Sequence, residues 1–235
     1  MRFFLNILFL LLFLSNYSTE SQEIQITETT TTEEVAFIPQ NFSNREQLIH
    51  TIKYYDNNVV ITDSTANSLS SAAMSLVDST IKYDGSFYKM DYPMGDVPDS
   101  IGVCTDVIIR AYRKLGVDLQ QLIHEDIVKS ISENGGYRVI KPDPCIDHRR
   151  VPNIQTFMER NGTSLSTLPN PHNYLPGDIV TWKMGYYEEL NHIGIVVNKK
   201  SDRYPFQYQV MHNIGGGQVI EDCLFSWTIS GHYRY

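Results

Sequence analysis

The spacing of the apolar residues changes once along this chain, from a period of 3.6 residues to a period of 2, and this change constrains the fold more than any other feature. In the first part of the chain, apolar side chains recur as they do on amphipathic helices. In the last part they alternate with polar ones, in short runs separated by turn residues. Strands that follow one another without helical crossovers predict an antiparallel sheet, so we expect an α+β fold. The expected helices cover residues 66–81, 104–115, 119–132 and 152–161, and the expected strands cover residues 178–182, 192–198, 206–212, 217–222 and 231–235.

The first residues have the composition of a secretory signal. Arg2 is followed by an apolar run, Phe3–Leu14, which is too short to span a bilayer comfortably and fits the apolar region of a signal peptide. Residues 1–18 are therefore the predicted signal peptide, with an uncleaved anchor as the alternative. Either interpretation predicts export to the periplasm or cell envelope, or secretion, and the first predicts no stable membrane insertion after cleavage.

A linker is expected between the signal and the folded part of the chain. Residues 19–42 are rich in Thr and Glu and contain little that a core could bury. Ser43 and Glu46 form a capping box that marks the start of a single domain, predicted at residues 43–235. The net charge is −8 and no cluster of positive charge is present, which argues against nucleic acid as a partner.

The three cysteines are informative in an exported chain, where disulfides can form. Cys145 and Cys223 could pair and leave Cys104 free, or all three could stay reduced. Cys104 lies in the first turn of the helix predicted at 104–115, on its apolar stripe. It is therefore either a small core residue or a nucleophile, since the N–H groups and dipole of a helix start stabilise a thiolate.

A nucleophilic cysteine needs a histidine that takes its proton and a third polar group that orients the histidine. His192 opens a predicted strand and is the expected base. Gly194 shares its face and leaves room for another backbone, so we expect the start of the Cys104 helix to lie there. His212, at the end of the next strand, is the expected third residue, with Asn213 as the alternative. The competing interpretation is a packed cysteine with structural histidines.

A second polar cluster, formed by Asp147, His148, Arg149 and Arg150, precedes the helix predicted at 152–161. Arginine binds carboxylates in bidentate geometry, so we expect this cluster on the substrate side of the site, with salt bridges inside the loop as the alternative. No HExxH or CxxC spacing supports a metal site, so neither a metal nor another cofactor is expected.

The order of these segments resembles the NlpC-type cell-wall cysteine peptidases of the papain-like clan. The resemblance rests on the helix cysteine followed by "YLPGDIVTW", "HIGIVV" and a polar residue on the next strand, and it covers roughly residues 83–235. The stretches "GVCTDVIIRAYRKLGVDLQ", "DHRRVPN" and "HNIG" also resemble one exported bacterial family of unknown function. In the NlpC-type motif Asp precedes the cysteine and Ser follows it. Here Val103 and Thr105 flank Cys104, and Asp106 is expected to face the helix dipole, so the substrate stays open.

The resemblance implies a papain-like core and a Cys104–His192–His212 triad acting on an amide or peptide bond. We therefore expect an exported thiol hydrolase, a cysteine peptidase or amidase, that cleaves peptidoglycan stem peptides without a cofactor. The backbone N–H of Cys104 would help to stabilise the oxyanion. The alternatives are a non-catalytic cell-wall binding or interaction module on the same fold and a thiol acyltransferase.

Overall fold

The structure is a computed structural model that describes residues 64–133, 136–139, 141–185 and 190–235. All of these residues belong to one compact unit, Arg45–Tyr235. The predicted signal peptide, linker and capping box lie outside the described residues. Within the described ranges, no helix combines the length and the apolar character that crossing a membrane requires.

Four helices confirm the helical first part of the pattern. They are α2 (Ser64–Met74), α3 (Cys104–Lys114), α4 (Leu119–Glu133) and α5 (Val151–Asn161), with short 3₁₀ turns η1 (Asp147–Arg149) and η2 (Pro171–Asn173). The prediction was wrong at the end of α2, which stops at Met74 rather than at residue 81. The chain leaves the helix because Asp78 pairs with Gln218, each backbone N–H donating to the other's carbonyl oxygen at 2.9 Å.

One antiparallel sheet of six strands follows, in the order β3-β8-β4-β5-β6-β7. The α+β prediction is therefore confirmed, and five of the six strands lie where the alternating pattern placed them. The sixth, β3, has only two residues, too few for a pattern to show. The strands are β3 (Thr163–Ser164), β4 (Ile179–Met184), β5 (Leu190–Lys200), β6 (Tyr208–His212), β7 (Val219–Glu221) and β8 (Thr228–Arg234).

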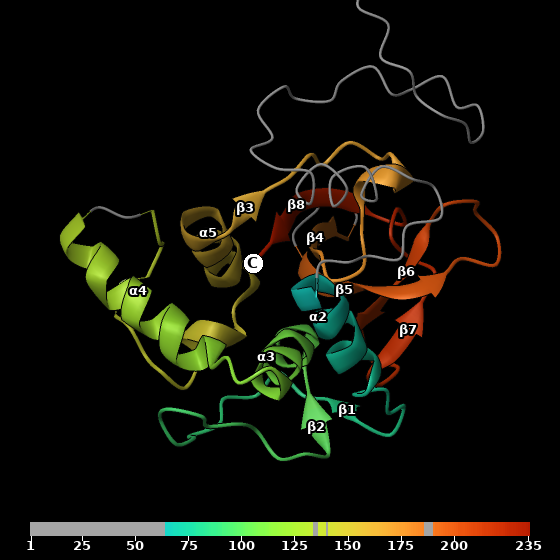
Figure 1. Ribbon diagram of the computed structural model, residues 1–235. Helices are drawn as coiled ribbons and strands as arrows, with labels where there is room; N and C mark the ends of the chain where they lie inside the picture. The colour runs from blue at the N-terminus through green and yellow to red at the C-terminus, as the bar shows by residue number, and fades with distance from the viewer. Residues whose placement is uncertain (1–63, 134–135, 140, 186–189) are drawn as a thin grey trace, which may run out of the picture. The chain divides into compact units, whose positions relative to one another are not determined.

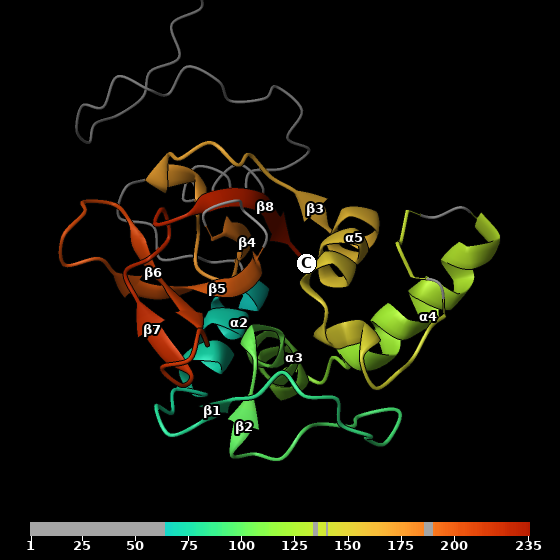
Figure 2. The ribbon, with the colours of Figure 1, turned by 180° about the vertical axis from the view of Figure 1, so that it is seen from behind.

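Each face of this sheet has its own core, because side chains alternate across a strand. Ile193 of β5 packs with Val107 of α3 on the helix side. On the opposite side Trp182 and Val196 pack with Leu224, which belongs to the connection after β7. In Figures 1 and 2, α3 and α5 lie between α4 and the sheet, and α4 contacts both of them.

A separate parallel pair of two-residue strands lies before α3. β1 (Lys82–Tyr83) pairs with β2 (Ile101–Gly102), and Tyr83 is the partner of Gly102. This pairing brings a segment from before the 88–98 loop to within two residues of Cys104. Neither strand was predicted.

Candidate active site

Cys104 is the first residue of α3, and its sulfur faces backbone N–H groups. These are the N–H groups of Cys104 itself, of Thr105 and of Ile193 on β5. Asp106 closes the first turn, since its Oδ2 accepts a hydrogen bond from the Val103 N–H at 2.7 Å. Cys104 is only 5% exposed. Burial raises the pKa of the thiol to about 11, with a smaller contribution from the Asp106 charge, so the resting thiol is neutral.

The sulfur occupies the point at which β5 and β6 separate. The Val196 N–H points toward β4, where it donates to Asp178 O at 2.9 Å, so by alternation the Ile193 N–H points toward β6. However, β6 ends at His212, which the register places opposite Gly194. The thiol therefore lies near the end of β6, where its pairing with β5 stops.

The expectation that the Cys104 helix starts on the Gly194 face is wrong. A Cβ atom at Gly194 would lie 2.5 Å from Val210 Cγ1 and 3.0 Å from Met211 O, so this glycine allows β6 to come close. Cys104 instead packs in the core that includes Ile193, on the opposite face of β5. It meets the His192 side of the sheet only at the end of the strands.

The structure brings His192 and His212 into direct contact, with 2.8 Å between His192 Nε2 and His212 Nδ1. The rings of Trp182 and Trp227 enclose the pair, with centroids 5.7 and 5.9 Å from that of His192. Burial, and then the charge of His212, lower the pKa of His192 to about 3. Burial also lowers the pKa of His212, although Glu221 opposes the shift. Both rings are therefore neutral near pH 7.

Cys104 and His192 are neighbours without a direct hydrogen bond. In the part of the chain that the structure describes, the thiol faces the N–H of Ile193, the residue after His192, and His192 Nε2 is hydrogen-bonded to His212 Nδ1. Catalytic contacts are often long in a free enzyme and shorten when substrate binds. The catalytic roles of Cys104, His192 and His212 stay predictions.

Asn213, the alternative third residue, makes different contacts. Its Nδ2 donates to Gly102 O at 3.1 Å, and its Oδ1 accepts from the Gly215 N–H at 3.0 Å. The side chain thus ties the end of β6 to the segment before Cys104. Of the two alternatives, His212 is the one in contact with His192.

Glu221 is a member of this site that the sequence analysis missed. Its Oε2 lies 2.8 Å from His212 Nε2, and its side chain is 50% exposed. The sulfur of Cys223 lies 3.8 Å from the same nitrogen. An acidic residue in a short edge strand is usually a solvated one, so the sequence offered no signal for this contact. All three cysteines of the chain are free thiols.

Tyr83 is a second missed member. The β1–β2 pairing places it beside the start of α3, with its hydroxyl near the Cys104 sulfur. Burial and then Cys104 raise the pKa of this phenol to about 12, so it stays protonated. Tyr83 is 49% exposed as a whole residue, while Cys104 is buried. Tyr83 therefore lies between the thiol and solvent.

Replacing Tyr83 by alanine should increase the rate at which iodoacetamide alkylates Cys104, because the ring that covers the sulfur is removed. The rate is measured at one alkaline pH by mass spectrometry of the peptide that contains Cys104. Tyr88→Ala is the matched control. The Tyr88 hydroxyl donates a hydrogen bond to Asp84 Oδ2 at 2.7 Å rather than approaching the thiol. Equal rates in the two variants would show that Tyr83 does not control access.

Arg149, expected on the substrate side, is part of the internal frame. Its Nε and Nη2 each donate to a carboxylate oxygen of Asp106 at 3.0 Å. Its Nη1 donates to Ser86 O at 3.0 Å and its Nη2 to Asp84 O at 3.2 Å. These contacts join the first turn of α3 to the segment after Tyr83. They favour the salt-bridge alternative and leave the substrate-binding interpretation of Arg149 without geometric support.

The other three residues of the polar cluster differ in exposure. Asp147 is buried, accepts the Asp143 N–H at 2.9 Å and pairs with His124 at 2.8 Å. His148 is 2% exposed, and its Nδ1 has no hydrogen-bond partner. Arg150 is exposed and remains the residue of this cluster most accessible to a substrate. Among the described residues, no three His, Cys, Asp or Glu side chains are grouped to hold a metal ion.

The buried histidines predict that acid destabilises the fold. Burial, followed by the charges of Arg113 and Arg149, lowers the pKa of His148 to about 4, while that of His192 is lowered to about 3. The histidines of the unfolded chain bind protons near pH 6.5, whereas those of the folded chain do not. The free energy of unfolding is therefore at its full value above pH 6.5 and falls as the pH decreases toward 4. Each histidine contributes at most about 1.4 kcal/mol per pH unit. Urea unfolding across this range measures the slope; His148→Gln should reduce it, and a flat profile would contradict the assignment.

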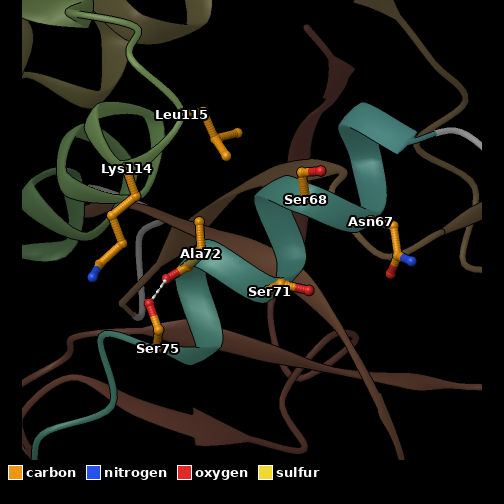
Figure 3. Close-up of a pocket in the computed structure, with 7 residues that line it drawn as sticks. All are labelled: Asn67, Ser68, Ser71, Ala72, Ser75, Lys114 and Leu115. Carbon is orange, nitrogen blue, oxygen red and sulfur yellow. Dashed lines mark hydrogen bonds between the residues drawn. The ribbon is translucent and has the colours of Figure 1, made fainter.

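A shallow hollow lies at the other end of α3. Residues of α2 and the last turn of α3 line it, and Figure 3 shows Ser75 donating to the Ala72 carbonyl beside it. Lys114 and Leu115 border the hollow, whereas Cys104 begins the same helix, about 15 Å away at 1.5 Å per residue. The hollow is therefore separate from the thiol and histidines.

Comparisons with known proteins identify a family. A family model described as "Domain of unknown function (DUF1287)" matches residues 70–235. "Uncharacterized protein YijF" of Escherichia coli (strain K12) is 43% identical over 179 residues, which cover 75% of this chain and 85% of that protein.

Two solved structures are similar in fold. NlpC1 and NlpC2 from Trichomonas vaginalis match with TM-scores of 0.41 and 0.39, each at 17% identity over 74% of this chain. The matches cover 46% and 49% of those chains, so this chain spans just under half their length. At this level the similarity concerns the arrangement of helices and strands.

Proposed function

We propose that this chain, which belongs to the DUF1287 family, is a thiol-dependent hydrolase of amide or peptide bonds. One observation carries the proposal. Cys104 opens a helix beside the strand that holds His192, and His192 and His212 are joined at 2.8 Å. A nucleophile, a base and a residue that orients the base thus lie next to one another at one end of the sheet.

The proposed reaction starts from a neutral thiol and a neutral imidazole. A resting ion pair would place two charges where burial opposes both, since the pKa of Cys104 is raised to about 11 and that of His192 is lowered to about 3. Proton transfer is therefore coupled to attack: His192 Nδ1 takes the thiol proton while the sulfur bonds to the carbonyl carbon.

The later steps use the same groups. The N–H of Cys104 and the hydroxyl of Tyr83 are the donors available to the developing oxyanion. His192 then gives its proton to the leaving amine, and the acyl group stays on Cys104 as a thioester. Water, deprotonated by His192, attacks the thioester and releases the acid and the free thiol.

Peptidoglycan stem peptides are the proposed substrates, and the cell envelope, or the space outside it, is the proposed location. The location is supported by the apolar run Phe3–Leu14 behind Arg2, which is typical of a signal for export. The substrate class is supported by the resemblance of the Cys104 and His192 segments to cell-wall peptidases. A transferase that passes the acyl group to an amine uses the same first step.

The burial of the thiol favours a second candidate, a non-catalytic wall-binding module. Cys104 is 5% exposed, and its raised pKa keeps it neutral, which also suits a packed core residue. In such a module the thiol would have no role in wall binding, so Cys104→Ala would bind cell-wall sacculi as well as the native chain.

The test is digestion of synthetic stem peptides and of sacculi by the full chain, followed by mass spectrometry. The proposal predicts new free amines with the native chain, none with Cys104→Ala, and an unchanged rate with the control Cys145→Ala. The Cys145 thiol contacts the backbone of Met90 and not the histidines. Binding of sacculi without cleavage by any variant would support the module, and a new amide formed with an added amine would identify a transferase.

A further inference from the structure

The carboxylate of Glu221 contacts the histidine pair, and it restricts which nitrogen of each ring can carry the proton. Glu221 Oε2 lies 2.8 Å from His212 Nε2, and His212 Nδ1 lies 2.8 Å from His192 Nε2. We propose that Glu221 is a positioning residue that selects one tautomer of each ring, so that His192 Nδ1 is unprotonated when substrate arrives. The catalytic meaning of this inference rests on the proposed function, but the tautomers themselves do not.

The position of each proton follows from the hydrogen bonds that link Glu221, His212 and His192. An ionised carboxylate only accepts hydrogen bonds, so the proton of neutral His212 must lie on Nε2. His212 Nδ1 then has a lone pair and no hydrogen, and it can only accept. His192 must therefore donate from Nε2, which leaves its Nδ1 bare. A bare Nδ1 is the form that takes a proton from a thiol.

The other groups around His212 do not impose this order. The sulfur of Cys223 lies 3.8 Å from His212 Nε2, and burial raises its pKa to about 12, so it is a neutral thiol that donates or accepts only weakly. The rings of Trp182 and Trp227 face the histidines and offer no acceptor oxygen or nitrogen. Within the described residues, Glu221 is the charged group in hydrogen-bond contact with the pair.

The backbone fixes this contact. β7 pairs with β6 so that Val219 is opposite His212 and Glu221 is opposite Val210. The carboxylate therefore reaches the imidazole diagonally across one pair of strands, within the distance at which such side chains interact. Its negative charge also favours the positive charge that His192 acquires during the reaction, since His212 links the two.

Glutamine at position 221 would remove the restriction and keep the shape of the side chain. The amide can turn its NH₂ group toward His212 Nε2, which then accepts. In that arrangement His212 carries its proton on Nδ1 and donates to His192 Nε2, so His192 carries its own proton on Nδ1. The nitrogen that must accept the thiol proton is then already protonated.

The experiment is long-range ¹H–¹⁵N NMR of the histidine rings in the full chain near neutral pH, which distinguishes a bare ring nitrogen from a protonated one. In the native chain we expect His192 and His212 both to carry the proton on Nε2. In Glu221→Gln we expect the Nδ1 resonance of His192 to move toward the position of a protonated nitrogen. Asp222→Asn is the matched control: it removes the adjacent carboxylate, which bonds Ser201 and Gln207, and should leave the spectrum unchanged.

Two results would overturn the inference: a native His192 with its proton on Nδ1, or tautomers that are identical in the native chain and in Glu221→Gln. Either leaves the proposed function standing if Cys104 still cleaves peptides. Conversely, the expected tautomer change in a chain that cleaves nothing would confirm the role of Glu221 on the rings and reject the hydrolase. Where both hold, Glu221→Gln should also lose hydrolysis in proportion to the fraction of His192 that carries its proton on Nδ1.

Discussion

Replacing His192 by alanine is expected to lower kcat/KM for amide hydrolysis by about 10²- to 10⁴-fold, the range that a general base contributes. The loss is large because the thiol cannot ionise by itself. With its pKa raised to about 11, the thiolate is a very small fraction of Cys104 near neutral pH. Without His192, attack would depend on that fraction or on water as the base.

The measurement is the initial rate of peptide cleavage by the full chain, with His172→Ala as the control. His172 is exposed in η2, where its ring lies 4.7 Å from that of Phe206, so its removal should leave the rate unchanged. The native rate should also persist well below pH 6.5, because the base is protonated only near its lowered pKa of about 3. Retention of the full rate by His192→Ala would exclude His192 as the base.

Local patterns in the sequence predicted the parts of this molecule that depend on local spacing. The helix of Cys104, the strand of His192 and the strand that ends at His212 all lie where periodicity placed them. His192 lies near the start of β5 and His212 at the end of β6. In adjacent antiparallel strands these two positions lie at the same edge of the sheet, so the pattern also predicted that the two histidines are close. A period of 2 or 3.6 residues is set by the backbone, so it is visible without the tertiary structure.

The features that were missed or wrong depend on contacts between distant segments. Tyr83 reaches the thiol through a pair of two-residue strands, which leave no periodic signal. The face of the sheet on which α3 packs depends on the whole core, so the single residue Gly194 does not determine it. Arg149 and Asp106 are 43 residues apart, and their pairing depends on how η1 folds back onto α3.

The pair of Asp106 and Arg149 gives the largest expected effect on stability. Their side chains are 3% and 2% exposed and lie 3.0 Å apart. Arg149→Ala leaves a buried carboxylate without its partner, which typically costs about 3–5 kcal/mol of unfolding free energy. The variant also releases Ser86 and Asp84, whose carbonyl oxygens Arg149 binds. Urea unfolding at neutral pH measures the loss.

A second substitution separates the charge from the packing. The double variant Arg149→Met with Asp106→Leu removes both charges and so leaves no isolated buried charge. Its loss of unfolding free energy should therefore be smaller than the sum of the losses of the two single variants. Lys129→Gln is the surface control. It breaks an ion pair with Glu133 whose side chains are 70% and 45% exposed, and it should cost no more than about 0.5 kcal/mol. If Arg149→Ala is as mild as Lys129→Gln, the start of α3 is held by contacts other than the Arg149 guanidinium, such as the Asp106 bond to the Val103 N–H, and the position of Cys104 does not depend on the buried pair.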